Sequence, residues 1–131
     1  NMVLEAAAGS NVKLYVSTFY QEGGSPEFDD GIKAWLNEDS TAMTNNGGND
    51  TIAAVTAMGY DAYYVALEAL KAAGSTDAGA VKAALPGVTY SGISGEIAFD
   101  DIGDAKRDAA YIKTANTETG AWDFVKIQGI D

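Results

Sequence analysis

The sequence predicts an α/β fold, and two observations support this prediction. Segments rich in β-branched and aromatic residues alternate with segments whose apolar residues recur at helical spacing. The 131 residues, 47% of them hydrophobic, are enough to build one core, which excludes a wholly disordered chain. The expected order is α-β-α-(β)-α-α-β-β-β. Its bracketed element, residues 51–57, fits either a short strand or the start of the next helix.

The first part of the chain predicts a helix, a strand and a second helix. Residues 2–8 are strong helix formers, and residues 12–19 have the β-branched and aromatic side chains typical of strands. Ser25 is a typical N-cap and Pro26 a typical first helical residue, so a helix is expected to begin there and to end near Asp39. The apolar stripe of this helix consists of Phe28, Ile32, Trp35 and Leu36.

The middle of the chain predicts a loop followed by a long apolar helix. Residues 40–50 are polar and contain two adjacent glycines, which is typical of a loop or of a flexible crossing between two structural units. We expect such a crossing near residues 45–56. The next helix extends from about Met58 to Ala73, and its apolar residues are so numerous that packing on most sides is expected.

The last part of the chain predicts one more helix and then strands. Residues 75–77 are a typical helix cap, and the helix they open runs to Leu85, where a proline follows. Residues 96–99 are typical of a short strand. Residues 109–115 and 121–127 are typical of two paired strands that a glycine-containing hairpin loop connects.

Charge and composition exclude several classes of function. Eight basic and 19 acidic residues give a net charge of −11, which opposes binding to nucleic acid or to anionic membranes. The sequence contains no Cys and no His, so it lacks thiolate nucleophiles and the commonest general base and metal ligand. No apolar run approaches the ~20 residues of a membrane helix, and no signal peptide is visible. Because residues 1–6 read as mid-helix sequence, we expect the chain to be a piece of a longer protein.

Motifs of known enzymes and metal sites are not matched. The phosphate-loop and Gly-x-Ser-x-Gly patterns are absent, and the glycines at Gly92 and Gly95 are not followed by a helix as a dinucleotide site requires. Asp100, Asp101 and Asp104 do not have the spacing of an EF-hand loop and predict a solvated acidic turn. We therefore expect no catalytic residue, no metal site and no cofactor.

A few side chains invite a functional reading beside a structural one. Phe19 and Tyr20 follow a strand directly, and ligands in open α/β sheets gather at such strand ends, although packing on a helix explains the two rings equally well. Asp61 reads as a first-turn acid that the helix dipole favours. Three tyrosines of the long helix could line a pocket, but core packing is the favoured reading: Tyr60, Tyr63 and Tyr64.

The order of several motifs resembles the periplasmic binding proteins of the branched-chain amino acid type. Residues 59–62 are similar to the Gly-Tyr-Asp-Ala start of a helix in that family, and residues 73–77 to its Ala-Gly-Ser ending and Asp cap. Residues 90–100 resemble the family's Gly-x-x-Gly-x-apolar-x-Phe-Asp segment, and residues 102–104 the turn that follows. With the strand at residues 12–20, the resemblance covers roughly residues 9–127.

The resemblance implies the solute-binding subunit of an ABC importer. Such a subunit is extracytoplasmic and has two lobes, each a flavodoxin-like parallel α/β unit, with the ligand in the cleft between them. This sequence resembles the C-terminal third, so the family's anchors for the charged ends of an amino acid lie upstream. The resemblance implies ligand contacts at Val55, Thr56 and Ala57, and the strand-end position adds Tyr20. The family often has an aromatic residue where Val55 stands, which leaves the ligand open.

Two alternative functions and two further expectations accompany this interpretation. The same fold also serves as a ligand-sensing domain of signalling receptors, and a flavodoxin-like enzyme without His or Cys would depend on carboxylates, Ser, Thr, Lys or a cofactor. The implied partners are an amino acid and an ABC permease. We expect the chain alone to bind amino acids weakly or not at all, and to form a homodimer because strand edges and apolar faces have lost their neighbours.

Overall fold

The computed structural model describes residues 2–129 and confirms the α/β class. The helices are α1 (Met2–Ala7), α2 (Pro26–Glu38), α3 (Ser40–Asn45), α4 (Ala54–Ala73) and α5 (Ala78–Ala84), followed by the 3₁₀ turn η1 (Leu85–Gly87). The strands are β1 (Tyr15–Thr18), β2 (Tyr90–Gly92), β3 (Gly95–Phe99), β4 (Ala105–Lys106), β5 (Ala109–Asn116) and β6 (Ala121–Gly129).

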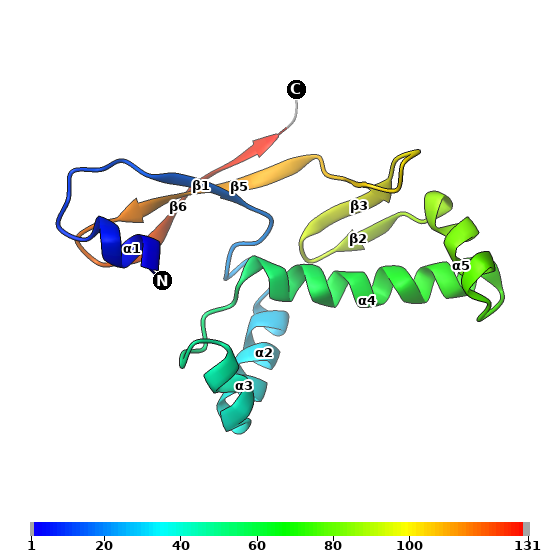
Figure 1. Cartoon of the computed structure of the whole chain (residues 1–131), viewed down its shortest axis with the longest axis horizontal. Coiled ribbons are helices and arrows are strands. Elements are labelled where there is room, and N and C mark those ends of the chain that lie inside the picture. Colours follow the sequence, from blue (N-terminus) through cyan, green and yellow to red (C-terminus); the bar gives the residue numbers. More distant parts are fainter. Residues whose placement is uncertain (1, 130–131) are drawn as a thin grey trace.

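The elements form two groups in an open, elongated molecule (Figure 1). One group is the sheet β1-β5-β6 with α1 beside it. The other contains the sheet β2-β3-β4, which lies along α4, together with α2, α3 and α5. The chain leaves the first group through residues 19–25 and returns to it through residues 107–108. Everything between these two connections belongs to the helical group.

Every strand pair among the described residues is antiparallel, which differs from the parallel sheets expected of complete lobes. The β5–β6 and β2–β3 pairs are consecutive strands joined by four and two residues, and connections that short permit only antiparallel pairing. β1 pairs with β5, although the whole helical group lies between these two strands in the sequence. Tyr15 is opposite Thr114, and Thr18 is opposite Tyr111. The described residues therefore do not form the parallel strand pairs that are expected of complete lobes.

The segment expected to be a loop contains a helix. Residues 40–50 include α3, whose first N–H groups are satisfied because the Asp39 carboxylate accepts from Thr41 N at 2.8 Å and from Ala42 N at 3.0 Å. Asp39 thus ends α2 and also caps α3, so the loop prediction is wrong for the first half of the segment. Residues 46–53 connect α3 to α4 within the helical group, and a lobe crossing near residues 45–56 stays a prediction.

The core consists of two small clusters along α4. Tyr20, Phe28, Ile52 and Ala57 pack where α2 meets the start of α4. Val65, Ala69, Val88 and Ile97 pack where the rest of α4 meets the β2–β3 hairpin.

The buried face of α4 is narrower than the apolar composition of this helix indicates. One line of residues four apart is buried, namely Ala57, Asp61, Val65 and Ala69. α4 itself begins at Ala54, which settles residues 51–57 as loop and helix start and excludes the short strand. The expectation that this helix packs on most sides is wrong for the described chain, since Tyr63 is 66% exposed and Leu70 is 37% exposed. In α2, similarly, Phe28 and Leu36 are buried while Trp35 is exposed.

Candidate functional site

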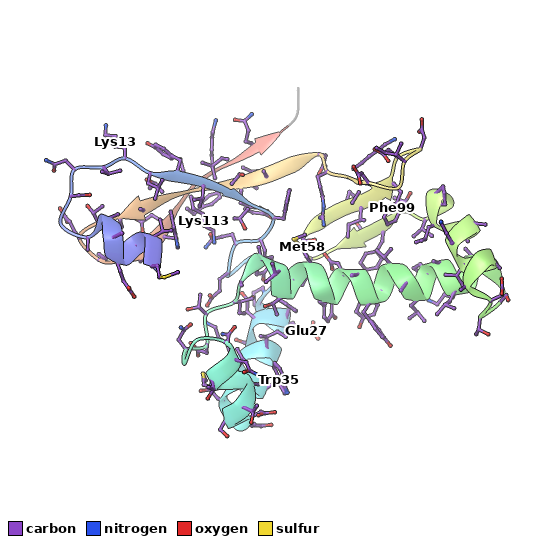
Figure 2. All side chains as sticks on the ribbon, in the orientation of Figure 1. Lys13, Glu27, Trp35, Met58, Phe99 and Lys113 are labelled. Carbon is purple, nitrogen blue, oxygen red and sulfur yellow. The ribbon has the colours of Figure 1, made fainter. Side chains whose placement is uncertain are left out.

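A hollow of about 520 Å³ lies where the two groups of elements meet. Gln21 and Glu22 line it from the first connection, and Thr51 lines it from the segment that leads into α4. Lys113 of β5 and Trp122 of β6 line it from the sheet. Figure 2 shows Lys113 below the sheet, on the side of α1 and of the start of α4. Side chains from distant parts of the sequence therefore converge on one concave site.

The rim of the hollow before α4 is held by its own polar groups. The Asn46 amide Nδ2 donates to the carbonyl of Asn49 at 2.7 Å and to that of Thr51 at 3.0 Å. The Asn49 Oδ1 atom accepts from the Thr51 N–H at 3.0 Å. These bonds fix the backbone of residues 46–51, so the two asparagines shape the rim.

The charge of Glu22 is engaged within the chain. One carboxylate oxygen forms an ion pair with Lys33 of α2, and the other accepts from the Ile52 N–H at 3.3 Å. The hydrogen bond to Glu22 raises the pKa of Lys33. Glu22 therefore ties the first connection to α2 and to the segment before α4.

Two other polar groups of the hollow are not satisfied in this way. The Gln21 amide donates to the Glu22 carbonyl at 3.1 Å, but its buried oxygen Oε1 finds no hydrogen-bond donor among residues 2–129. Burial lowers the pKa of the half-buried Lys113, and the nearby charge of Glu22 opposes that shift only in part. The hollow thus presents one unused acceptor and one ammonium group that is poorly compensated.

The four ligand-contact residues expected from the sequence are close in the chain to residues that line the hollow. Tyr20 is buried, and its hydroxyl donates to Asp29 Oδ1 at 2.6 Å and accepts from the Ser25 N–H at 3.2 Å. Ala57 is fully buried in the same cluster, Thr56 is half-buried and Val55 is 73% exposed. None of the four lines the hollow, although Tyr20 directly precedes Gln21. Their contact with a ligand stays a prediction.

Sequence reasoning missed the residues that do line the hollow. Gln21 and Glu22 read as ordinary polar loop residues, because their burial depends on the approach of the segment before α4. For Lys113 one local indication exists, namely a charged residue inside the otherwise apolar run of residues 109–112 and Ala115. Its direction toward the hollow follows from the pairing of β5 with β1 and β6, which no local pattern specifies.

Asp61 of α4 forms a second buried polar cluster. Its carboxylate accepts from the Ile93 N–H at 3.0 Å, from the Ser94 N–H at 2.8 Å and from the Ser94 hydroxyl at 2.5 Å. Because α4 begins at Ala54, Asp61 lies beyond the first turn and is fully buried, so the helix-dipole reading is wrong. The carboxylate instead holds the turn between β2 and β3.

Arg107 extends this cluster to both connections between the groups. Its guanidinium donates to the Ser94 carbonyl at 2.8 Å and to the Ser94 hydroxyl at 2.9 Å. The same guanidinium lies 5.2 Å from the centre of the Phe19 ring, within the range of a cation–π contact. Both oxygens of the Asp61 carboxylate and the hydroxyl and carbonyl of Ser94 therefore have partners, and the arrangement is structural.

The tyrosines of α4 form a row of ring contacts that is partly open to solvent. Tyr64 stacks on Tyr90 with ring centres 5.9 Å apart, and Phe28 meets Tyr60 edge-on at 5.1 Å. A hydrogen bond from the Tyr60 hydroxyl to the Tyr64 hydroxyl raises the pKa of Tyr60 to about 12. Tyr60 and Phe28 also line a shallow hollow of about 450 Å³. The rings thus pack on one another and border a pocket at the same time.

Neither a metal cluster nor a membrane helix appears in the part of the chain that the structure describes. Within residues 2–129, no three side chains of the metal-binding types lie together. The acidic turn uses its own backbone, because the Asp100 carboxylate accepts from the Ile102 and Asp104 N–H groups at 3.0 and 2.8 Å, which lowers the pKa of Asp100. None of the helices in these residues combines the length and apolarity needed to cross a bilayer.

The fold is similar to that of a solved amino-acid-binding protein. The crystal structure of the leucine-binding protein LivK from Thermotoga maritima matches with a TM-score of 0.65 and 24% sequence identity. Along the matched residues the chain has part of the fold of a type I periplasmic binding protein. The match covers 98% of this chain and 34% of LivK, so the chain spans about a third of the length of that protein. No protein family model and no curated protein matches the sequence.

Proposed function

We propose that the chain is the C-terminal part of an extracytoplasmic receptor that binds an amino acid and delivers it to an ABC permease. The observation that carries this proposal is the fold match along 98% of the chain to a protein named for binding leucine. The 34% of LivK that is covered agrees in size with the third of the protein that the sequence resemblance implies.

The hollow supports binding in preference to catalysis. Its polar groups are amides, an ammonium and a carboxylate already paired with Lys33, and the sequence offers no His or Cys that could act as general base or thiolate nucleophile. Its volume of about 520 Å³ lies within the range of small-molecule sites. Such a group of side chains holds and orients a ligand.

The position of the hollow supports the expectation that tight binding requires the whole receptor. It lies at the junction of the two groups of elements, and its walls come from both. In a two-lobed receptor most affinity comes from groups that converge from both lobes and from closure of the cleft over the ligand. We therefore expect an amino acid to bind the complete receptor tightly and this chain alone with a dissociation constant in the millimolar range or weaker.

Two measurements test the proposal. The coding sequence upstream of residue 1 is expected to encode the remaining lobe elements and a secretion signal or lipid-anchor motif. Isothermal titration calorimetry of that longer protein with a panel of amino acids is expected to give at least one tight complex. A longer protein that binds none of the standard amino acids would rule the function out.

The isolated chain is also expected to form a homodimer. Trp35 and Tyr63 are more than half exposed, and such apolar groups favour contact with a second copy. Light scattering at several protein concentrations measures the mass directly. A monomeric mass at all concentrations would contradict this expectation without affecting the proposed ligand class.

A further inference from the structure

The strand β6 is an open edge of its sheet. It is the last strand in the order β1-β5-β6, so its outer side pairs with no other strand among residues 2–129. Eight of its nine residues are exposed, and the apolar side chains of Phe124, Val125 and Ile127 are between 43% and 55% exposed. β6 contains no proline, and the unpaired N–H and C=O groups of such an edge can bind a further strand. This edge is therefore a surface that fits an added β-strand.

A bulge in β6 determines which of its side chains share a face of the sheet. The register shifts at Val125, which has no residue opposite it on β5. Asp123 is opposite Thr114, and Lys126 is opposite Ile112. Because Thr114 and Ile112 are two residues apart on β5, they project from the same face, and so do Asp123 and Lys126. By the same comparison, the residues that project from the other face are Trp122, Phe124 and Ile127.

This arrangement makes β6 complementary to a second copy of itself. Two antiparallel copies can be aligned so that Asp123 of each copy lies opposite Lys126 of the other. The same register places Trp122 opposite Ile127, so charged residues meet on one face and apolar residues on the other. The two bulges then meet at the centre of the pairing, so they do not shift the register. Two-fold symmetry repeats both kinds of pair, which doubles their effect.

The charges also select this register over its neighbour. Asp123 accepts from the Asn116 amide at 2.9 Å and Lys126 donates to Gln128 at 2.6 Å, but both partners are neutral. Among residues 2–129, neither Asp123 nor Lys126 forms an ion pair, so each is available to an opposite charge. A register shifted by two residues also keeps the faces matched, but it places Asp123 opposite Gln128 and loses both charge pairs.

From this complementarity we propose that two copies of the chain pair antiparallel along β6, with Asp123 of each copy opposite Lys126 of the other. The two three-stranded sheets then join into one continuous sheet. The proposal gives a surface to the expected homodimer and does not depend on the ligand. Pairing along one strand buries a small interface, so we expect a dissociation constant on the order of 10 μM. Well below that concentration the chain is monomeric and the side chains of β6 are exposed.

Reversing one charge at a time tests the pairing by sedimentation velocity of the whole chain at several concentrations. Asp123→Lys places two ammonium groups opposite each other at both symmetric positions, and Lys126→Asp places two carboxylates there. We expect each variant to raise the dissociation constant about tenfold or more. Asp123→Lys makes the net charge of −11 less negative, so weaker pairing of this variant cannot come from general repulsion.

The two variants should pair with each other. In a mixture, all the opposing positions of an Asp123→Lys chain and a Lys126→Asp chain carry opposite charges again. We expect native mass spectrometry to show mixed dimers in excess over either homodimer, and the double variant Asp123→Lys/Lys126→Asp to dimerise like wild type. Hydrogen exchange at residues 121–129 should slow as the dimer forms. A mixture without an excess of mixed dimers would overturn the inference.

Two control variants separate β6 from other surfaces. Lys13→Asp changes the net charge as Lys126→Asp does, on the exposed segment before β1 (Figure 2), and is expected to leave dimerisation unchanged. Tyr63→Ser removes an exposed ring of α4 and is expected to have no effect either. Loss of the dimer in Tyr63→Ser, equal weakening by Lys13→Asp and Lys126→Asp, or a monomeric wild type at all concentrations would each mean that the copies do not pair through β6. None of these outcomes bears on amino-acid binding by the longer receptor.

Discussion

The two buried polar clusters of this chain differ in whether their groups are satisfied. The Asp61 carboxylate accepts three hydrogen bonds, and the Arg107 guanidinium donates to the carbonyl and the hydroxyl of Ser94. At the hollow, Gln21 Oε1 and the Lys113 ammonium have no such partners within the described chain. Buried polar groups that are fully bonded stabilise a fold, whereas an unmatched buried group costs free energy until a partner reaches it. The predictions below change one cluster at a time.

The largest effect is expected from Gly92→Ala. A Cβ atom at this position would approach the Asp61 carboxylate more closely than 3.0 Å, a separation that real Cβ atoms do not show. Either the β2–β3 turn moves away from α4 or the carboxylate loses its hydrogen bonds, so we expect a loss of about 3 kcal/mol or more in the free energy of unfolding. Urea denaturation followed by circular dichroism measures it.

Gly59→Ala is the matched control for that variant. Gly59 lies inside α4, and an added Cβ would meet nothing within 4 Å. Because alanine is the better helix former, this change is expected to raise the free energy of unfolding by about 0.5–1 kcal/mol. Equal behaviour of the two variants would mean that the Asp61 carboxylate does not constrain residue 92.

A second large effect is expected from Asp61→Asn, which keeps the size of the side chain. One carboxylate oxygen becomes an amide NH₂ group that cannot accept from the Ser94 N–H or the Ile93 N–H. We expect a loss of about 2–3 kcal/mol in the free energy of unfolding and faster hydrogen exchange at both amides. Unchanged exchange protection at residues 93 and 94 would contradict the role assigned to Asp61.

Local sequence patterns predicted the elements whose boundaries have local causes. Ser25 and Pro26 mark the start of α2, and Gly74 ends α4 in the left-handed conformation, with φ of 58°. The helix α3 was missed because Ser, Thr and Asn are weak helix formers, and its capping residue Asp39 also reads as the end of α2. Where one residue serves two elements, a single pattern conceals the second.

The two polar clusters could not be predicted, because each depends on contacts between distant residues. Asp61 meets Ile93 across 32 positions of the sequence, and the approach is possible only because Gly92 has no side chain. Lys113 and Gln21 share a hollow only after β5 has paired with β1. Composition and spacing show which residue types are present, but they do not predict these contacts between distant residues.

A moderate effect with a distinct pH dependence is expected from Tyr20→Phe. The change removes the hydroxyl that donates to the buried Asp29 and accepts from the Ser25 N–H, at a cost of about 1–2 kcal/mol near neutral pH. Burial, and then the hydrogen bond to Asp29, raise the pKa of Tyr20 above its ordinary value of 10.0.

The sign of the pH dependence follows from that raised pKa. The stability contributed by the neutral Tyr20 hydroxyl is fully present below pH 10 and is lost as the pH rises further, since the unfolded chain then ionises more readily. The difference between wild type and Tyr20→Phe should therefore shrink above pH 10. Thermal unfolding at pH 7 and pH 11 measures it, and a difference that grows with pH would show that this hydroxyl is not the group involved.

The smallest effect is expected to have the opposite sign, because it comes from the unsatisfied cluster. Lys113→Met keeps the length of the side chain and removes a half-buried charge whose pKa burial lowers. The variant should be more stable than wild type by about 0.5 kcal/mol at pH 7, because it removes a partly desolvated charge whose cost solvent screening keeps small. The gain should disappear above pH 10.5, where Lys113 is neutral in the folded and the unfolded chain.

Thermal melts of the two proteins at both pH values measure the difference, with Lys126→Met as the exposed control. A loss of stability at pH 7 would mean that Lys113 already has an adequate partner within the chain, and the contrast between the two clusters would then have to be abandoned.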